Sequence, residues 1–458
     1  MKNLVFSILT GDGMKARAIR GTALSIIGFG GSQVIRLGSN LILTRILFPE
    51  AFGLMALVLI VLAGLEMFSD IAIGPSIIQS ARGDEETFLN TAWTLQILRG
   101  IVLWLAACAL AIPIAHFYEQ DALARMIPVV GFSTVIAGFS SIGMYTANRH
   151  LTLGRLTALE LAAQVVGTLV MIGLALWLQS VWALVLGSLA IAMAKTALSH
   201  VFLPGPGNRI GWDKSAFLEI FHFGKYIFLG TIAGFFIQHG DRLVLGKFIS
   251  LEELAVYTIA LLFAGIPQML NNHLVSRVLL PLYKNRPPSE NAGNRAQIGQ
   301  ARFLLRLAFL GLGAVLALGG EPLVSLLYDS RYQLAGPLLV LVSLSLLSKI
   351  IIGGYDAILL ANGNSRDFTI LTVGTAVLRV IVLLVLVQNY GVLGAVLASV
   401  LIDILTYPAL VYFIRPYRGW YPGQDLGFLI LALAIGTLAL WMSPTAQTML
   451  ADVFAAGG

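Results

Sequence analysis

Residues Leu41–Leu57 read LILTRILFPEAFGLMAL, and residues Leu243–Ile259 repeat the pattern as LVLGKFISLEELAVYTI, at one constant offset and without a gap. In this register Arg45 aligns with Lys247, and the apolar residues around them align with apolar residues. Each copy is typical of the end of one hydrophobic helix, a short polar turn and the start of the next helix. We therefore infer a duplicated unit of about 200 residues.

The composition identifies the class of protein. Of 458 residues, 58% are hydrophobic and only 11% are charged, and the mean hydropathy is +0.87, which excludes an ordinary soluble enzyme and indicates a polytopic membrane protein. The single cysteine, Cys108, excludes an intramolecular disulfide and a thiolate metal cluster. The net charge of +6 lies mostly between the apolar segments, so it indicates membrane topology and not nucleic-acid binding.

Apolar segments of roughly 20 residues recur along the chain, which is the length that crosses a hydrocarbon core of about 30 Å. Short polar connections separate them. The predicted spans are 18–43, 51–74, 90–117, 124–147, 157–178, 181–203, 224–248, 253–283, 301–320, 334–361, 366–388, 391–414 and 424–444.

We expect an all-α polytopic membrane protein with about 13 transmembrane helices, within a range of 12–14, in two six-helix lobes. An even number of spans in each lobe makes the two lobes a parallel repeat. A second alignment, of Arg155–Ser188 with Arg366–Ser399, supports this repeat. The expected parts are an N-terminal lobe with a short cytoplasmic N-terminus, a cytoplasmic linker, a C-terminal lobe, and an additional helix and tail: 1–203, 204–222, 223–414 and 415–458.

The connections alternate in charge along the chain, as the positive-inside rule requires. Basic connections, beginning with Lys15, Arg17 and Arg20, fall on one side of the membrane, which places the N-terminus in the cytoplasm. The N-terminal segment lacks a long apolar region and a cleavage site, so we expect it to be retained. The largest basic group follows the eighth span and is expected to face anionic lipid. Its members are Lys284, Arg286, Arg295, Arg302 and Arg306.

Catalysis has no visible location in this sequence. The loops are too short for a soluble catalytic domain, and there is no GxxxxGK[ST] loop for a nucleotide. The six histidines are scattered, so neither a metal site nor a Ser/His/Asp set is expected. Function is therefore expected in the ionisable residues inside the spans, since each costs a few kcal/mol in lipid and normally turns inward.

Basic residues within the spans are the candidates for an anionic substrate. They would line a central cavity between the lobes and meet diphosphate oxygens through charge-assisted hydrogen bonds. Lys349 and Arg379, together with Asp403, are expected near the midpoints of three successive spans, where reaching the interface is hardest. The candidate substrate-binding residues are Arg36, Arg99, Lys349 and Arg379.

Acidic residues within the spans are candidates for coupling or for structural ion pairs. Glu66 and Asp70 are spaced i, i+4, so they are expected on one helix face, where a coupling proton or Na⁺ would bind. The alternative is internal pairing that holds helices together, as in Arg379 with Asp403 or Lys349 with Asp356. The candidate set is Glu66, Asp70, Asp356 and Asp403, and we expect no cofactor beyond a coupling H⁺ or Na⁺.

Three stretches carry a resemblance to a known family. RILFPEAFGLMAL (Arg45–Leu57), FSDIAIGPSIIQ (Phe68–Gln79) and DRLVLGKFISLEELAVYTIA (Asp241–Ala260) resemble the bacterial oligosaccharide flippases. These are the Wzx-like polysaccharide transporters of the multidrug/oligosaccharidyl-lipid/polysaccharide superfamily. Members are commonly described with twelve or fourteen helices, so an expected thirteen is a departure.

The resemblance implies transfer of an undecaprenyl-diphosphate-linked oligosaccharide across the bacterial cytoplasmic (inner) membrane, with an inward- to outward-facing change and a cation-lined lumen. It also implies work beside glycosyltransferases and a polymerase, in exopolysaccharide, capsule or O-antigen biosynthesis. The partners expected are thus the lipid-linked oligosaccharide and membrane lipid, without nucleic acid. Three alternatives stay open: a multidrug or cation antiporter, a peptidoglycan-precursor flippase, and a membrane-embedded polymerase or ligase.

Overall fold

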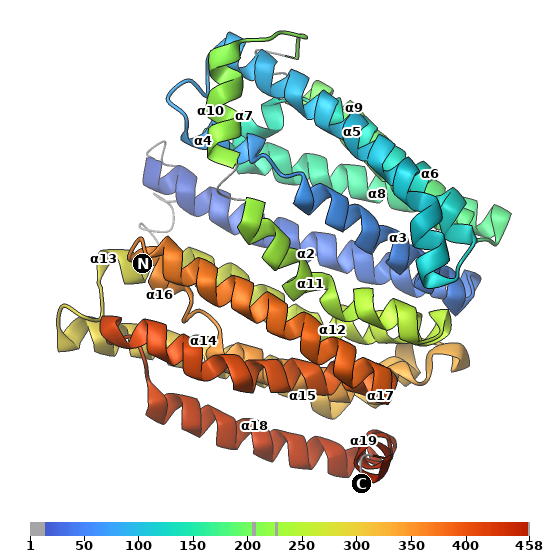
Figure 1. The fold of residues 1–458 in the computed structure, drawn as a ribbon, viewed down its shortest axis with the longest axis vertical. Helices are drawn as coiled ribbons and strands as arrows, with labels where there is room; N and C mark the ends of the chain where they lie inside the picture. Colours follow the sequence, from blue (N-terminus) through green and yellow to red (C-terminus); the bar gives the residue numbers. More distant parts are fainter. Residues whose placement is uncertain (1–13, 204–207, 225–227, 457–458) are drawn as a thin grey trace. The chain divides into compact units, whose positions relative to one another are not determined.

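The computed structural model describes residues 14–203, 208–224 and 228–456, and every regular element in these ranges is helical (Figure 1). The predicted all-α class is therefore confirmed. The N-terminal segment that we expect on the cytoplasmic surface lies, over residues 1–13, outside the described residues. Residues 204–207 of the predicted linker lie outside them as well.

The chain divides into two compact units, Met1–Ile232 and Ala233–Gly458, and the boundary falls within α11 (Phe228–Phe248). Each unit is described by itself. The helices of unit 1 before this boundary are α2 (Met14–Ile46), α3 (Pro49–Phe68), α4 (Ile73–Gln79), α5 (Glu86–Tyr118), α6 (Ala122–Gly138), α7 (Gly143–Arg149), α8 (Leu153–Leu178), α9 (Trp182–Phe202) and α10 (Lys214–Gly224).

Unit 2 continues from α11 with longer and more interrupted helices. Its elements are α12 (Leu251–Leu274), the π-helical η1 (Val275–Leu279), α13 (Leu280–Asn285), α14 (Ala292–Leu327), η2 (Ser330–Tyr332), α15 (Ala335–Ile352), α16 (Ala357–Ala361), α17 (Ser365–Ile414), η3 (Arg415–Tyr417), α18 (Pro422–Met442) and α19 (Pro444–Ala456).

The repeated hairpin has the same helix boundaries in both copies. The offset that aligns Leu41 with Leu243 also aligns the last residue of α2 with the last of α11, and the first residue of α3 with the first of α12. The second helix starts differently in each copy. α3 has Pro49 in its first turn, whereas α12 has a capping box in which the Glu253 amide donates to Ser250 Oγ at 3.2 Å and the Ser250 amide donates to Glu253 Oε2 at 3.0 Å.

Nine described helical segments are long and apolar enough to cross a membrane, or ten if the bent pair α6 and α7 forms one broken span. The predicted spans 18–43 and 224–248, which correspond to α2 and α11, are not among these nine. α17 counts once although it covers two predicted spans, because Gly391, with φ 53° and ψ −130°, joins two helices at a kink. A multi-pass membrane protein is confirmed, and the count of thirteen stays a prediction.

The predicted span 124–147 corresponds to two helices and not to one straight helix. α6 ends at Gly138 and α7 starts at Gly143, and the two helices are bent by 61°. Polar contacts to α9 and to the segment after it hold the break. The Ser141 amide donates to Ser199 Oγ at 2.9 Å, and Ser141 Oγ donates to the Leu203 carbonyl at 2.9 Å. These contacts satisfy backbone groups that a straight helix would satisfy internally.

In unit 1, α2 packs on α8, α8 on α9, α9 on α6, and α6 on both α5 and α3. Glycines allow the closest approaches. A Cβ at Gly100 of α5 would lie 2.4 Å from the Thr134 carbonyl oxygen of α6, and one at Gly167 of α8 would lie 2.6 Å from the Ile191 Cα of α9. Unit 1 is therefore a bundle whose helix backbones approach closely, as small residues permit in membrane proteins.

In unit 2, α15 is the central helix and contacts α12, α14, α17, α18 and α19. Its apolar residues are buried along most of its length. Its one charged residue, Lys349, therefore lies inside the helix bundle of unit 2.

Candidate functional site

A cluster of charged side chains lies within unit 2, on helices α11, α15 and α17. Asp241, Arg379 and Asp403 are only 5%, 4% and 7% exposed. The charge of Arg379 interacts with Asp241, with Lys349 and with Asp403. We call Asp241, Arg242, Lys349, Arg379 and Asp403 the unit 2 charge cluster.

Asp241 has direct partners from its own helix and from α12. The Tyr257 hydroxyl donates to Asp241 Oδ2 at 2.9 Å, and Arg242 Nε lies 3.9 Å from Oδ1. Tyr257 is itself only 2% exposed. The carboxylate of Asp241 is therefore held between the two halves of the second hairpin copy.

Asp403 of α17 is bound to α15, because the Ser348 hydroxyl donates to Asp403 Oδ2. The next residue, Lys349, lies in the last turn of α15 and, as predicted, near the middle of the candidate span Ser330–Ala361. A cation is favourable in this position, since unpaired carbonyls gather at a helix C-terminus. The predicted Lys349 pair with Asp356 is wrong: Lys349 interacts with Asp403 and Asp241, whereas Asp356, exposed before α16, has Arg302 as its charged neighbour.

Arg379 is a cation of the cluster with spare hydrogen-bonding capacity. Its Nε atom is buried and has no hydrogen-bond partner among the described residues. With all groups ionised, the cluster holds three cations and two carboxylates, so its formal charge is one unit positive. A buried, unpaired N–H on a cation is costly, and an anion that reaches it gains a charge-assisted hydrogen bond.

Arg99, a predicted substrate ligand in unit 1, is engaged in holding the end of α3. Its Nη2 donates to the Glu66 carbonyl at 2.7 Å, and its Nε donates to the Ser69 carbonyl at 3.0 Å and to Ser69 Oγ at 3.1 Å. These carbonyls belong to the last turn of a helix, which leaves acceptors unpaired. Arg99 thus has a structural role in this conformation.

The predicted shared face of Glu66 and Asp70 is wrong. α3 ends at Phe68, so the i, i+4 spacing does not lie on a continuous helix. Asp70 Oδ1 accepts a hydrogen bond from the Ala72 amide at 2.8 Å, and Ala72 has a positive φ of 54°. The charged neighbours of Glu66 are Arg99 and Lys195, and the Lys195 amine lies 3.3 Å from Glu160 Oε1.

Arg36 lies on α2 with an exposed side chain. The structure therefore brings Lys349, Arg379 and Asp403 together in unit 2 and places Glu66 beside Arg99 in unit 1. A lumen shared by Arg36 and the unit 2 charge cluster stays a prediction.

A second buried network in unit 2 escaped the sequence analysis. Arg302 and Arg306 of α14 are 1% and 2% exposed, so the prediction that these two arginines face lipid is wrong. Arg306 Nη2 lies 2.8 Å from Asp425 Oδ1 of α18. The Arg302 guanidinium lies 3.6 Å from the centre of the Tyr355 ring and donates to the Tyr283 hydroxyl at 2.9 Å.

Tyrosine hydroxyls complete this network. Tyr355 donates to both oxygens of Asp425 at 2.8 Å, and Tyr407 donates to Oδ2 at 2.6 Å. The sequence contained one signal for it: Arg302 and Arg306 are spaced i, i+4, which places them on one face of a helix. Grouping both arginines with the basic residues after the eighth span hid that signal, although the predicted span 301–320 contains them and α14 starts at Ala292.

Among the described residues, no group of His, Cys, Asp and Glu side chains could hold a metal ion. The acidic residues of the unit 2 charge cluster are instead paired with cations and with hydroxyl donors.

Comparison with known sequences gives one family. Residues 42–337 match the polysaccharide biosynthesis protein family. The chain is 20% identical to the teichuronic acid biosynthesis protein TuaB of Bacillus subtilis (strain 168) over 82% of this chain and 78% of TuaB. It is 22% identical to the lipopolysaccharide biosynthesis protein WzxC of Escherichia coli (strain K12) over 92% of this chain and 88% of WzxC.

Comparison with solved structures gives the fold. The lipid II flippase MurJ in an inward closed conformation matches with a TM-score of 0.71 and 12% identity, over 95% of this chain and 98% of MurJ. An inward-facing multidrug resistance transporter of the MATE family matches with a TM-score of 0.62 and 14% identity, over 84% of this chain and 95% of that one. At these identities the likeness concerns the fold alone.

Proposed function

Because the chain belongs to the polysaccharide biosynthesis protein family, we propose that it moves an undecaprenyl-diphosphate-linked oligosaccharide repeat unit across the membrane by alternating access. Relatives named for teichuronic acid and lipopolysaccharide biosynthesis support a role in building a surface polysaccharide. The likeness in fold to a flippase and to a multidrug transporter supports transport and not polymerisation.

The observation that carries this proposal is the surplus positive charge of the unit 2 charge cluster. A lipid diphosphate brings negative charge and many acceptor oxygens into a membrane protein. Arg379 is buried with an unpartnered Nε, and Lys349 lies beside it. These two cations supply the charge and the donors that a diphosphate requires. A cation antiporter would instead be expected to have mainly acidic residues at its substrate site.

We place the protein in the bacterial cytoplasmic membrane with a cytoplasmic N-terminus. The charge alternation of the connections supports this orientation. In this position it would receive the lipid-linked oligosaccharide from glycosyltransferases and deliver it to a polymerase. The carboxylates of Asp241 and Asp403, paired with cations of the same cluster, are the groups through which a coupling proton or Na⁺ would act on the substrate site.

Deletion of the gene tests the proposed function directly. Lipid-linked oligosaccharides are extracted from cells with and without the gene, and the side of the membrane that holds them is determined. Accumulation of complete undecaprenyl-diphosphate oligosaccharide facing the cytoplasm is the expected result. Accumulation of single repeat units facing the periplasm would show that flipping is intact and would favour a polymerase. Accumulation of the peptidoglycan precursor would favour the alternative flippase.

Variants of one helix test the site. Arg379→Ala is expected to stop glycan export at a normal level of membrane-inserted protein. Arg379→Lys should be partly active if charge dominates, and inactive if bidentate geometry dominates. The matched control is Arg366→Ala, which removes an exposed arginine at the start of the same helix. Normal export by Arg379→Ala, or equal loss in both alanine variants, would refute the role of Arg379.

A further inference from the structure

Helix α10 and the residues before it are docked on unit 1 near the ends of α4 and α5 (Figure 1). On the inner face of α10, Ala216 and Ile220 are fully buried in a core that includes Phe88 and Leu89 of α5. The segment before the helix follows the first turns of α5. The Arg209 amide donates to the Asn90 side chain at 3.1 Å, so the residues before α10 contact α5 as well.

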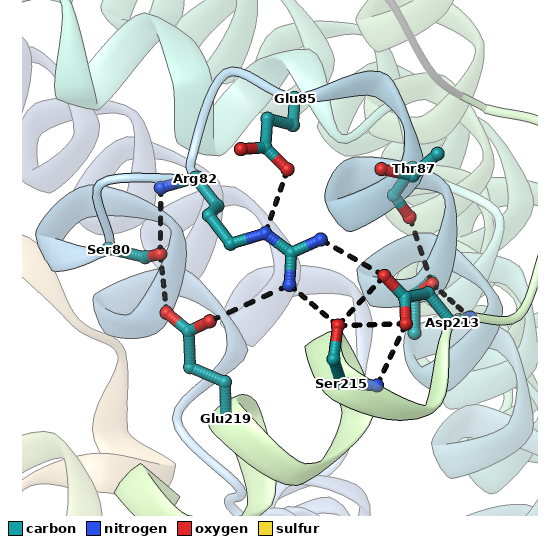
Figure 2. A network of polar contacts seen from close by, with 8 residues as sticks. Ser80, Arg82, Glu85, Thr87, Asp213, Ser215 and Glu219 are labelled. Carbon is teal, nitrogen blue, oxygen red and sulfur yellow. Dashed lines mark hydrogen bonds and ion pairs between the residues drawn. The ribbon is translucent and has the colours of Figure 1, made fainter.

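Polar contacts fix the rotation of α10 about its axis. Figure 2 shows Arg82, from the loop between α4 and α5, among acceptors from its own loop and from α10 with the residues before it. Its Nη2 donates to Asp213 Oδ2 at 3.0 Å, and its Nη1 donates to Ser215 Oγ at 2.9 Å and lies 3.9 Å from Glu219. Its Nε donates to Glu85 at 2.7 Å. The acidic side chains near and on α10 are thus turned toward Arg82.

Exposed apolar side chains lie on α10 and on the residues just before it. Ile210, Trp212, Leu218 and Phe221 are 83%, 57%, 49% and 50% exposed, and we call them the outer ridge. The Trp212 ring stacks on Phe217 at a centroid distance of 5.0 Å, and Phe217 stacks on Phe221 at 5.8 Å. Phe217 therefore links the two aromatic members of the ridge, Trp212 and Phe221, in one stack.

Basic side chains flank the ridge. Lys214 is exposed, and Arg209, whose side chain is 83% exposed, lies 3.9 Å from Glu86. Asp213 and Glu219 interact with Arg82, so the exposed Lys214 and Arg209 are the basic groups that border the outer ridge. An apolar ridge with a basic border fits the surface of an anionic bilayer.

The length of α5 fits a membrane boundary beside α10. The 33 residues of α5 form a helix about 50 Å long, whereas the hydrocarbon core is about 30 Å thick. At least one end of α5 thus extends beyond the hydrocarbon. Its first turns carry Glu86 and Asn90, and α10 is docked beside these turns.

We propose that α10 is a membrane-surface helix, whose outer ridge enters the acyl boundary of the lipid leaflet while Lys214 and Arg209 contact anionic headgroups. Arg82 holds the helix in the rotation that presents this face. The partner is the lipid surface, and the proposal is independent of the transported substrate.

Depth measurements on the full chain in vesicles test the proposal. In a Cys108→Ser background, a nitroxide is placed at Phe221→Cys or, in a separate variant, at Leu218→Cys. Reference labels are placed at Leu105→Cys, an exposed position within α5, and at Ser289→Cys, an exposed position in the turn before α14. Vesicles contain phosphatidylcholine alone or with phosphatidylglycerol, and collisions with oxygen and with a water-soluble nickel chelate are measured.

We expect the ridge labels to collide with oxygen and to lose collisions with the chelate, as the label at 105 does. A label at 221 as accessible to the chelate as the label at 289 would overturn the proposal. A label shielded from both reagents would also overturn it, since this result would show that a protein surface covers the ridge. The two ridge positions give the same test if one variant fails to insert.

The charge requirement is tested by Lys214→Glu. In vesicles with phosphatidylglycerol, this variant is expected to shift the label at 221 toward the water, with no shift in phosphatidylcholine alone. The matched control is Lys284→Glu, at an exposed lysine of unit 2. Equal shifts in both lipids, or no shift in either, would refute the contact with anionic headgroups.

Discussion

The buried pair Arg306 and Asp425 allows a prediction of stability. Asp425→Asn keeps an oxygen acceptor for the hydroxyls of Tyr355 and Tyr407 but removes the carboxylate charge. Arg306, 2% exposed, then loses the ion-pair partner that it has among the described residues, and Arg302 loses a carboxylate in its vicinity. Loss of one partner of a buried ion pair costs about 3–5 kcal/mol. Because the tyrosine hydrogen bonds persist, we expect a loss near the lower end, about 3 kcal/mol.

The free energy of unfolding is measured in mixed micelles by titration with a denaturing detergent, with tryptophan fluorescence as the signal. Asp452→Asn on α19 is the matched control, since Asp452 is exposed. Surface substitutions of this kind usually change stability by less than about 0.5 kcal/mol.

A double variant separates the charge from the hydrogen bonds. In Arg306→Met with Asp425→Asn, the unpaired cation is gone, so stability should return to within about 1–2 kcal/mol of the starting protein. Equal destabilisation by Asp425→Asn and by Asp452→Asn would refute the reasoning. Simple addition of the two single effects in the double variant would refute it as well.

Two further predictions concern the backbone of unit 2 and the docking of α10. Gly354 has a φ of +77°, and a Cβ there would lie 3.0 Å from Val275 Cγ2, so Gly354→Ala should destabilise by about 1–2 kcal/mol in the same unfolding assay. Gly374→Ala, which meets nothing within 4 Å, should be neutral or stabilising. The hydrogen bond from Arg82 lowers the pKa of Asp213 to about 2, from an ordinary 3.8. A lowered pKa stabilises the docked state at every pH above the ordinary value, so amide-exchange protection of α10 should persist there and decline as the pH falls toward 2. Arg82→Gln should abolish this acid dependence, and unchanged acid dependence would contradict the assignment.

The elements that were predicted best are those with a local physical signal. Apolar length identifies a membrane span without knowledge of its neighbours, and the repeated hairpin gives helix ends that agree between its two copies. Burial of Arg379 and Asp403 was predictable for the same reason, because an ionisable residue far from both ends of an apolar segment has no route to water.

The errors concern residues whose partners lie on other helices. The i, i+4 rule for Glu66 and Asp70 assumed a continuous helix, whereas Arg99 from α5 takes up the carbonyls at the end of α3. Arg302 and Arg306 were assigned to a basic group that faces anionic lipid, because positive charge after a span usually marks the cytoplasmic side. Their burial depends on Asp425, which is more than 100 residues away in the chain.

The breaks in the helices of unit 2 connect the second network to the charge cluster. Lys349 lies one turn before the Gly353–Gly354 break of α15, and that break packs on Val275, the first residue of the π-helical η1. Tyr355, directly after the break, is held by Asp425 of α18. π-Helical turns and breaks of this kind frequently occur at functional sites. α18, which we predicted as an additional helix after two sets of six, therefore fixes the end of the helix that presents Lys349, and it belongs to the structural support of the candidate site.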